Sequence, residues 1–532
     1  MKLRIIILSG VLILSGIACK KSFFEHPSET SPTIDTYYTN AEQVNGATGI
    51  LYNSVWNDWF DKAFISVGDV LGGTVTGALG NAQYNSFGNF NIQSTDDLVG
   101  TTWTACYRAA GQASVLIQTF ETKKKTAADP AYLDYGIAEA RFIRGFAYFY
   151  IARTFKDAPI VANPLDLTLP GKYLVPRHIQ KDVLRFALED FKAAEAVLGE
   201  TPYQDGRVTK YSAKGMMAKV YLYLKDYANA KAKAKEVIDY ATASGKIGLH
   251  PDYNGIFTSS AIANTGNKED LFSLRWLTSL SWNGANRYQL YVGPQPLLAP
   301  APTGGSGYSA VVPSLDMLDE ATGYAATDKR RGWSVMEHGF QKAAWVNASY
   351  PAGFKYDTTG TGTDNFKIRT GTRSSIQKYV VGPNRTGEPV NTNSHSQICT
   401  YVLRYADVLL IYAEAVLAGG ASTSDGTALS AFNAVHTRAG LTAVSSLNLD
   451  LILHERKVEF AFEGDYWFDI SRQGFAKAKA MIEAQERGTY NANKQLTSLK
   501  ISLASESQLF LPVPQAETVK DPLLLDPPVP YY

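Results

Sequence analysis

The stretch AEARFIRGFAYFYIARTF, residues Ala138 to Phe155, indicates the fold class because its apolar side chains recur with the period of an α-helix. Phe142, Phe146 and Phe149 stand at positions i, i+4 and i+7, and apolar neighbours widen the face that they form. So wide an apolar face is typical of a helix that packs against other elements on both flanks. We therefore predict a buried helix here, with its N-terminal signal upstream at Asp129-Pro130 and its end at Asp157 to Pro159.

Three further helices are predicted just downstream, at Val183 to Leu198, Ser212 to Leu224 and Ala228 to Tyr240. Ser212 is expected to be the N-cap of the second of these helices. Lys225-Asp226 makes a short turn, and the helix after it is rich in alanine, which lets paired helices approach closely. A helix, a short turn and an alanine-rich helix form the unit of a tetratricopeptide-type hairpin.

A second helical group is predicted near the C-terminus, at Arg404 to Val416, Leu429 to Arg438 and Leu451 to Glu463. The first of these is apolar nearly all round, so we expect it to be central. Between the two groups, residues 251–400 are rich in Gly, Asn, Thr, Ser, Pro and Trp. Such excursions are either binding segments or tolerated surface insertions. Three tryptophans in this stretch favour binding: Trp276, Trp282 and Trp345.

The N-terminus has the pattern of a bacterial lipoprotein signal. Lys2 and Arg4 precede an uncharged run from Ile5 to Ile17, which is too short to span a membrane and matches a secretory core. Cys19 follows and is the expected lipidation site, although Gly16 stands where a lipobox usually has Leu. The alternative is an ordinary cleaved signal with an incidental cysteine.

Three parts are therefore predicted along the chain. Residues 1–18 form the signal peptide, and residues 19–40, rich in Pro, Ser and Thr, form a lipid anchor and tether. Residues 41–532 form a single domain that includes the loop-rich excursion near 251–400. The other cysteines, Cys106 and Cys399, lie in apolar surroundings and are expected to be free buried thiols.

Composition excludes some classes of function and leaves others open. Lysine and arginine total 51 and aspartate and glutamate 50, a net charge of +1, so nothing suggests binding to nucleic acid. The 31 tyrosines and 8 tryptophans help to raise the aromatic share to 12%, which suits sugars, whose apolar faces stack on rings. The same tyrosines can instead fill a large helical core.

Several motifs in sequence resemble those of the SusD/RagB family of Bacteroidetes lipoproteins, nearly from end to end. They are FFEHPSETSPTIDTYYTNAEQVNGATGILYNSVW (residues 23–56), Trp103 and Tyr107 as W-x3-Y, AEARFIRGFAYFYIARTFKDAPI (138–160), LRYADVLLIYAEA (403–415), FNAVHTRAGL (432–441), ILHERKVEFAFEGDYWFDISRQG (452–474) and LFLPVPQAE (509–517). Three positions depart from the family pattern: Lys156 replaces Gly, and His436 and Tyr466 replace Arg.

The resemblance implies a mostly α fold, in which four tetratricopeptide-like helix pairs form a right-handed scaffold with long irregular loops and a few short strands. It also implies a role. Proteins of this family cap SusC-like TonB-dependent transporters of the outer membrane, capture glycans or in some members peptides, and deliver them. They are not enzymes, and no cofactor is implied.

The C-terminal helix of the second group carries Glu455, Glu459 and Glu463 at intervals of four residues, which would repel one another unless cations face them. We predict an Arg–Glu lattice, with partners chosen from Arg404, Arg438, Arg456 and Arg472. A surface glycoside hydrolase, with two of these acids catalytic, is the less favoured interpretation, because it needs one acid held protonated. No histidine spacing supports a metal site, since Val458 fills the second histidine position of an HExxH pattern that begins at His454.

The resemblance places ligand loops before the helix of Trp103 and near residues 275–350. Within them, aromatic rings stand beside amide and guanidinium donors, which is the chemistry that a sugar needs. The candidate ligand-binding residues are Trp282, Tyr288, Trp276, Arg287, Asn283, Asn286, Tyr84 and Phe87, with Phe90 in the same loop as the last two. Trp282 and Tyr288 are preferred, because the Asn and Gly around them disfavour burial. Arg287 can alternatively serve an anionic sugar or a peptide carboxylate.

Overall fold

The computed structural model describes residues 37–532 apart from 78–81, 259–263, 278–283, 295–296, 298–306, 348, 360–370, 384–394 and 492. The long helices carry the scaffold: α2 (Ala41–Gly49), α4 (Asp97–Lys124), α5 (Ala131–Phe155), α6 (Gln180–Val197), α7 (Lys210–Tyr223), α8 (Tyr227–Ser244), α14 (Tyr405–Leu417), α15 (Gly426–Arg438), α16 (Leu449–Glu459) and α18 (Phe475–Ala484). None of the helices in these ranges is both long and apolar enough to span a bilayer.

Shorter helices fill the remainder: α3 (Ala82–Gly88), α9 (Tyr253–Ile256), α10 (Tyr288–Val292), α11 (Leu315–Leu318), α12 (Lys329–Ser334), α17 (Tyr466–Ser471) and α19 (Gln515–Thr518). Single 3-10 turns are η2 (Ile50–Tyr52), η3 (Ser54–Trp56), η5 (Pro164–Thr168), η7 (Glu506–Leu509) and η8 (Pro522–Leu525), whereas η4 (Trp59–Val70) is a π-helix of 12 residues.

The described strands are short and pair two by two, all antiparallel: β1 (Val75–Gly77) with β3 (Val311–Pro313), β2 (Asp270–Leu274) with β8 (Thr400–Arg404), β4 (Val335–Met336) with β7 (Ser375–Ile376), β5 (Gln341–Lys342) with β6 (Phe354–Lys355), and β9 (Thr489–Tyr490) with β10 (Leu496–Thr497). The β2–β8 pair joins the start of the excursion to the strand that leads into α14, with a register shift along it. The fold class predicted from sequence, mostly helical with a few short strands, is confirmed.

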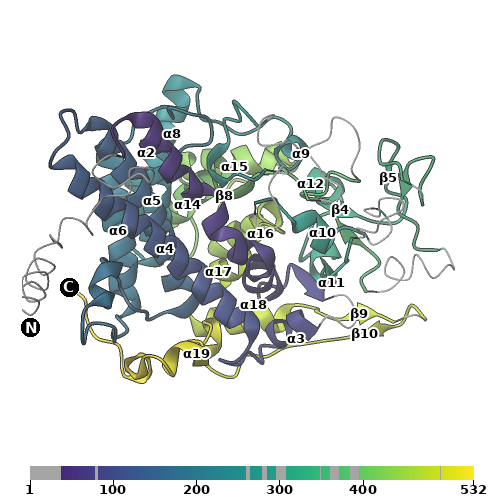
Figure 1. Cartoon of the computed structure of the whole chain (residues 1–532). Coiled ribbons are helices and arrows are strands. Elements are labelled where there is room, and N and C mark those ends of the chain that lie inside the picture. Colours follow the sequence, from purple (N-terminus) through teal and green to yellow (C-terminus); the bar gives the residue numbers. More distant parts are fainter. Residues whose placement is uncertain are drawn as a thin grey trace, which may run out of the picture.

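The long helices pack in a row in which each contacts the next, from α4 through α5, α6, α7 and α8 to α14 and then α15 (Figure 1). This succession of packed hairpins is the arrangement expected of helical repeats. The excursion, with α9 to α12 and the short strands, lies on the other side of α14 and α16. The scaffold therefore occupies one half of the molecule and the irregular segments the other.

The predicted helices are confirmed, with shifted ends. Helix α5 begins at Ala131, just after the predicted N-terminal signal, and ends at Phe155 as expected, because Lys156 turns to a positive φ of 65°. Helix α7 begins earlier than predicted, at Lys210, so the prediction that Ser212 is the N-cap is wrong. Thr209 is the cap, its hydroxyl accepts from the amide of Ser212, and the Ser212 hydroxyl accepts from the amide of Thr209 in a capping box.

The helix predicted to reach Glu463 ends at Glu459, which is the end of α16. Phe462 has a φ of 66°, which is incompatible with a continuing helix, and the turn is fixed by Asp69 at the end of η4. The Asp69 carboxylate accepts from the amides of Phe462 and Gly464 at 3.2 and 3.1 Å. A tertiary contact therefore overrides the helical pattern. Cys106 and Cys399 are free and buried, as predicted.

Candidate functional site

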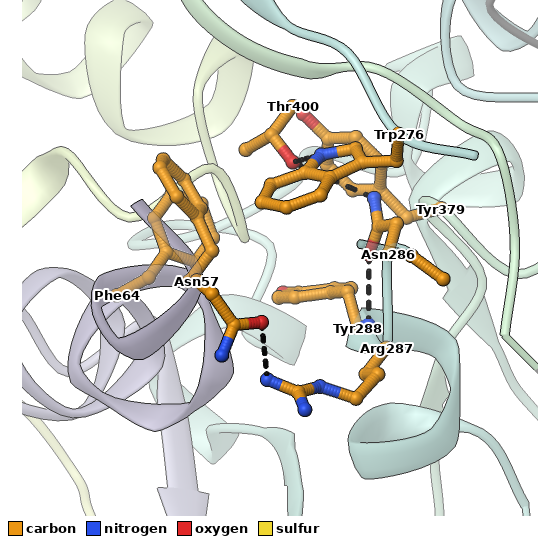
Figure 2. Close-up of a pocket in the computed structure, with 10 residues that line it drawn as sticks. Asn57, Phe64, Trp276, Asn286, Arg287, Tyr288, Tyr379 and Thr400 are labelled. Carbon is orange, nitrogen blue, oxygen red and sulfur yellow. Dashed lines mark hydrogen bonds between the residues drawn. The ribbon is translucent and has the colours of Figure 1, made fainter. Parts of the chain in front are cut away.

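Four predicted ligand residues, Trp276, Asn286, Arg287 and Tyr288, come together in one aromatic and polar cluster beside η4 (Figure 2). The Trp276 indole donates to the Thr400 hydroxyl at 2.8 Å, and the Asn286 amide donates to the carbonyl of Ile398 at 2.8 Å. Both partners belong to the segment that forms β8 or leads into it. The cluster therefore links the two edges of the excursion to each other.

Arg287 and Tyr288 connect the same cluster to the rest of the chain. The Arg287 guanidinium donates to the Asn57 side chain at 2.9 Å, just ahead of η4 (Figure 2). The Tyr288 hydroxyl donates to the carbonyl of Phe462 at 2.9 Å, in the turn after α16. These contacts join three segments that are far apart in the sequence.

The cluster is closed to a sugar. Its side chains are buried, with Trp276 only 1% exposed and Tyr288 5% exposed, and the void between them is about 10 Å³, at most the room for one water molecule. The expectation that neighbouring Asn and Gly keep Tyr288 exposed is therefore wrong. Hydrogen bonds from these small polar residues to the backbone draw the segment into the core.

Trp276 and Asn286 lie on either side of residues 278–283 in the sequence. The amide of Leu277 donates to the carbonyl of Gly284 at 2.9 Å, so the two ends of residues 278–283 are held together. That segment carries Trp282 and Asn283, which lie outside the described residues. Trp276 and Asn286 are therefore anchors for the base of the segment on which the preferred ligand residue is found.

Tyr84, Phe87 and Phe90, predicted in the loop before α4, are buried as well, at 2%, 0% and 6% exposed. Phe87 lines an open cleft of about 1190 Å³ between η4, α3, the start of α4 and α19. Its other lining residues are Asp58, Lys62, Ser86, Ser94, Thr95, Asp96, Asp97, Leu98, Gly100, Thr101, Thr104, Pro514, Gln515, Ala516, Val519 and Lys520. None of these three aromatics lines the void at the centre of the Trp276 cluster.

Sequence reasoning missed this cleft. Hydroxyl and carboxylate side chains line it, and the amide of Gln515 donates to the carbonyl of Ser94 at 2.9 Å, which joins two of its walls. The run of Ser94 to Asp97 before a helix is an ordinary N-terminal signal, and the motif that contains Gln515 was informative only through the family resemblance. No local sequence pattern indicates that the segment of Ser94 and the segment of Gln515 are in contact.

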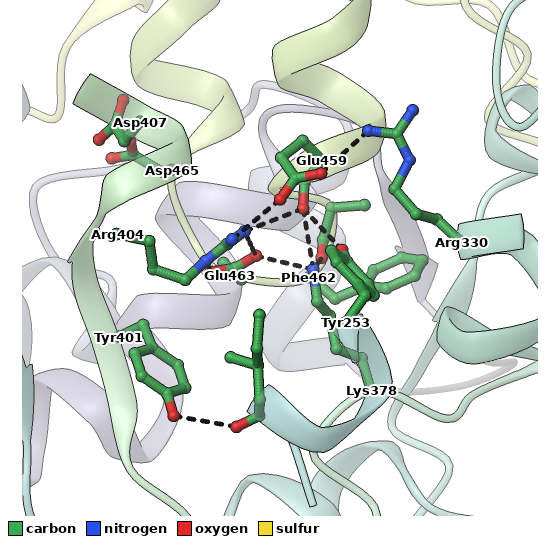
Figure 3. A network of polar contacts seen from close by, with 12 residues as sticks. Tyr253, Arg330, Lys378, Tyr401, Arg404, Asp407, Glu459, Phe462, Glu463 and Asp465 are labelled. Carbon is green, nitrogen blue, oxygen red and sulfur yellow. Dashed lines mark hydrogen bonds and ion pairs between the residues drawn. The ribbon is translucent and has the colours of Figure 1, made fainter. Parts of the chain in front are cut away.

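The predicted Arg–Glu lattice exists and is buried (Figure 3). Glu459 accepts hydrogen bonds from Arg404 at 2.8 Å, Arg438 at 2.6 Å and Arg330 at 2.9 Å. Glu463 binds Arg404 and Lys378, both at 2.7 Å. Burial alone raises the pKa of Glu459, but the guanidinium groups of Arg438, Arg404 and Arg330 hold it well below the ordinary value.

The predicted partners are right in part. Glu455 pairs with Arg330 and His436, both at 2.7 Å, and Arg330 was not foreseen. Arg456 and Arg472, named as candidates, bind aspartates and another glutamate in place of the three predicted acids. Their partners are Asp407, Asp469 and Glu414. Arg456 follows Glu455 within α16, so the two side chains point about 100° apart around the helix and reach different neighbours.

A metal site and a protonated catalytic carboxylic acid were both considered from the sequence, and each can be compared with the structure. Within the described ranges, no group of three His, Cys, Asp or Glu side chains is arranged to hold a metal ion. Asp69 is a carboxyl whose pKa is raised by burial to about 7, but it is 0% exposed and its oxygens accept from Thr74 and two backbone amides. It lies beneath the surface and holds a turn.

Comparison with known proteins agrees with this architecture. Residues 268–532 match the SusD family, and residues 33–222 match a family described as starch-binding associating with outer membrane. A SusD-like protein of Bacteroides ovatus is 27% identical over all of this chain and 98% of its own length. SusD-like protein P2 of Formosa agariphila is 26% identical over 86% of each chain.

Solved structures also match this chain over nearly its whole length. One, determined with a xylogluco-oligosaccharide, has a TM-score of 0.78 and 26% identity, and the match covers 92% of this chain and 99% of that one. A laminarin-binding SusD-like protein has a TM-score of 0.68 at 22% identity, over 91% and 98% of the two chains, which is a likeness of fold. With the scaffold, the motifs and these matches together, the chain belongs to the SusD/RagB family.

Proposed function

We propose that the protein is a cell-surface glycan-binding protein that captures oligosaccharide or polysaccharide chains. The observation that carries this proposal is the likeness, over nearly the whole length of both chains, to a relative whose structure holds a xylogluco-oligosaccharide. The excursion supports it as well, because its segments are held on a rigid helical frame by buried polar contacts. Loops supported in this way are common places for binding.

We assign the ligand contacts to residues 278–283, which lie between Trp276 and Asn286 in the sequence. Trp282 offers a ring for stacking on a sugar, and Asn283 offers hydrogen bonds to its hydroxyls. Trp276, Asn286, Arg287 and Tyr288 are positioning residues that fix the base of this segment. In this proposal their loss weakens binding only through that segment.

Capture without catalysis is the expected chemistry. The interpretation as a glycoside hydrolase depends on three acids that are each buried and paired with a cation: Glu455, Glu459 and Glu463. The pKa of Glu455, like that of Glu459, lies below its ordinary value, because Arg330 and His436 outweigh the effect of burial. Neither can supply the protonated acid that glycoside hydrolysis requires.

The location and the partner complete the proposal. Lipid attachment at Cys19, with the tether to residue 40, would hold the domain at the outer membrane, facing outward, and the family description of outer-membrane association supports this placement. The partner is a SusC-like TonB-dependent transporter, which receives the captured glycan. Two measurements test this: Cys19→Ala should release the protein from the membrane fraction, and the transporter should co-purify with the unaltered protein.

Affinity electrophoresis tests glycan binding. We expect the purified chain to be retarded in gels that contain xyloglucan or another neutral polysaccharide, with no reducing ends released. Trp282→Ala should abolish the retardation, whereas Tyr173→Ala should leave it intact, because Tyr173 is an aromatic residue, 62% exposed, on the loop between η5 and α6 and outside the excursion. Equal retardation of Trp282→Ala and the unaltered protein would show that the site is elsewhere. Retention by immobilised peptides and by no polysaccharide would favour the peptide-binding alternative.

A further inference from the structure

Two neighbouring segments carry the most exposed large hydrophobic side chains of the protein. Among the residues that the structure describes, six such side chains are more than half exposed, and all six lie in residues 164–174 or 519–532. They are Leu165, Leu169, Tyr173, Val519, Leu525 and Tyr532. Single exposed apolar residues are ordinary, but this concentration in two short segments indicates a surface that contacts another apolar body.

The two segments are held together by hydrogen bonds. The amide of Val175, just after the first segment, donates to the Asp521 carboxylate at 2.8 Å. The amide of Val529 donates to the carbonyl of Arg177 at 2.9 Å, and the Arg177 guanidinium donates to the carbonyl of Asp526 at 2.7 Å. The second segment ends beside α6, on the side of the molecule opposite β5 (Figure 1). We call the surface formed by the six side chains the apolar edge.

The chain that follows the lipid anchor joins the fold near the apolar edge. The described structure begins at residue 37, and the ring of Tyr38 packs against Phe120 of α4, with centroids 5.1 Å apart. Two residues earlier on α4, Gln118 donates to the side chain of Asn163, which caps the turn that begins the first segment. Residues 19–36 span at most about 60 Å, so an anchored lipid keeps this edge within reach of the bilayer.

The side chains of the apolar edge suit the boundary between water and lipid. Tyrosine is enriched at membrane interfaces, because its ring is apolar and its hydroxyl stays wet, and leucine adds apolar area. Lys172 stands beside Tyr173 and Lys520 beside Val519, and both lysines are exposed. A lysine can lay its apolar stem along such a surface while its ammonium group stays among the lipid headgroups.

Charge neither drives nor prevents approach to a bilayer. In residues 164–185 and 517–532 the cations are Lys172, Arg177, Lys181, Arg185 and Lys520, and the acids are Asp166, Asp182, Glu517, Asp521 and Asp526, with the carboxylate at Tyr532. Asp182 and Asp521 are buried and accept from backbone amides. The remaining charges are nearly balanced, so apolar contact must supply most of the affinity and anionic lipid should change it little.

We propose that the apolar edge contacts the lipid surface to which the protein is anchored, with Leu165, Leu169 and Tyr173 entering the interfacial region. This inference rests on the lipid anchor of the proposed function and goes beyond it, because an anchor alone does not fix which side of the domain faces the bilayer. The contact fixes that side and leaves the excursion, in the other half of the molecule, clear of the lipid (Figure 1).

Fluorescence quenching by lipid tests the contact on the full-length lipoprotein, floated with vesicles of phosphatidylcholine, alone or in equal parts with phosphatidylglycerol. A nitrobenzoxadiazole dye is attached at Tyr173→Cys, and Cys106 and Cys399 stay unlabelled because they are buried. We expect a nitroxide on the lipid acyl chain to quench this dye in both kinds of vesicle, and its emission to shift to the blue. The control Val346→Cys, 47% exposed between β5 and β6, should show neither effect.

A second variant tests the apolar residues themselves. Leu165→Ser combined with Leu169→Ser should reduce the quenching at Tyr173→Cys without lowering the melting temperature, because both leucines are more than half exposed. If the protein floats but the dye is quenched equally at positions 173 and 346, or at neither, the contact is overturned and the anchor stands.

Two other outcomes would also overturn the contact. Protein that does not float with the vesicles would refute the anchor and the contact together, whereas glycan binding in gels is measured separately and would stand. Shielding of the dye at Tyr173→Cys from iodide in native outer membranes, without quenching in lipid vesicles, would assign the apolar edge to a protein partner.

Discussion

Replacing Glu459 with glutamine tests the ionic network at the centre of the fold. The substitution keeps the shape of the side chain and removes the negative charge that Arg330, Arg404 and Arg438 share. Glu459 is 0% exposed, so water cannot replace the lost charge. Removing one partner from a buried ion pair costs about 3–5 kcal/mol, because it leaves the other charges uncompensated.

The cost converts into a change in melting temperature through the unfolding entropy. At about 2.1 cal/mol/K per residue, a domain of roughly 500 residues has an unfolding entropy near 1 kcal/mol/K. Each kcal/mol therefore shifts the melting temperature by about 1 °C, and Glu459→Gln should lower it by about 3–5 °C. Differential scanning calorimetry at neutral pH measures this shift.

Lowering the pH provides an independent test of the contribution of Glu459 to stability. The folded protein holds the pKa of Glu459 well below its ordinary value of 4.5, so the folded state binds fewer protons than the unfolded state there. The stabilisation is therefore complete above pH 4.5 and is lost as the pH falls toward the folded pKa. The gap in stability between the unaltered protein and Glu459→Gln should narrow as the pH falls below 4.5.

A surface pair supplies the control. Glu506 is 63% exposed and pairs with Lys156 at 3.2 Å, so Glu506→Gln should change the free energy of unfolding by less than about 1 kcal/mol. If Glu459→Gln melts within 1 °C of the unaltered protein, as the control should, the network contributes little net stability and the reasoning from burial is refuted.

Two further predictions concern the π-helix η4. Gly68→Ala places a Cβ 2.1 Å from the backbone of Gly464 and should lower the melting temperature by about 1–3 °C. The control Gly46→Ala, in α2 with open space around it, should raise the melting temperature slightly. Equal melting temperatures of the two variants would contradict this packing. The pKa of Asp69 is about 7 in the folded protein against 3.8 in the unfolded chain, so its contribution to the free energy of unfolding falls as the pH rises from about 4 to 7. Chemical denaturation across that range should find a shallower fall in stability for Asp69→Asn than for the unaltered protein. Parallel curves of stability against pH would refute the raised pKa.

Periodic apolar patterns were enough to predict the scaffold, because helices such as α5 bury a wide face whose spacing survives in one dimension. Their ends were less predictable. α16 stops at Glu459 because Asp69, nearly 400 residues earlier, binds the amides of the following turn. No local signal reports a contact between positions so distant in the chain.

The candidate site shows the same limit for polar residues. Trp276, Asn286, Arg287 and Tyr288 lie together, but the Asn and Gly around Tyr288 predicted that it is exposed, and all four side chains are buried. Asparagine and arginine favour a surface unless the fold supplies partners, and here Thr400, the Ile398 carbonyl and Asn57 supply them. Because those partners come from other segments, only the three-dimensional structure distinguishes an anchor from a ligand contact.

The ionic network gives a physical reason to reject the interpretation of residues 251–400 as tolerated insertions. Glu269, Arg330 and Lys378 stand at three separate places in that excursion, and each binds a buried charge on or beside α14 and α16. An insertion that merely loops out has no need to bury charges, since each buried ion needs a partner in a fixed position. Removing any of the three takes one partner away from a buried charge of the scaffold, Arg404, Glu459 or Glu463 respectively. The excursion is therefore tied into the scaffold by buried charges, and its position on α14 and α16 depends on these ion pairs.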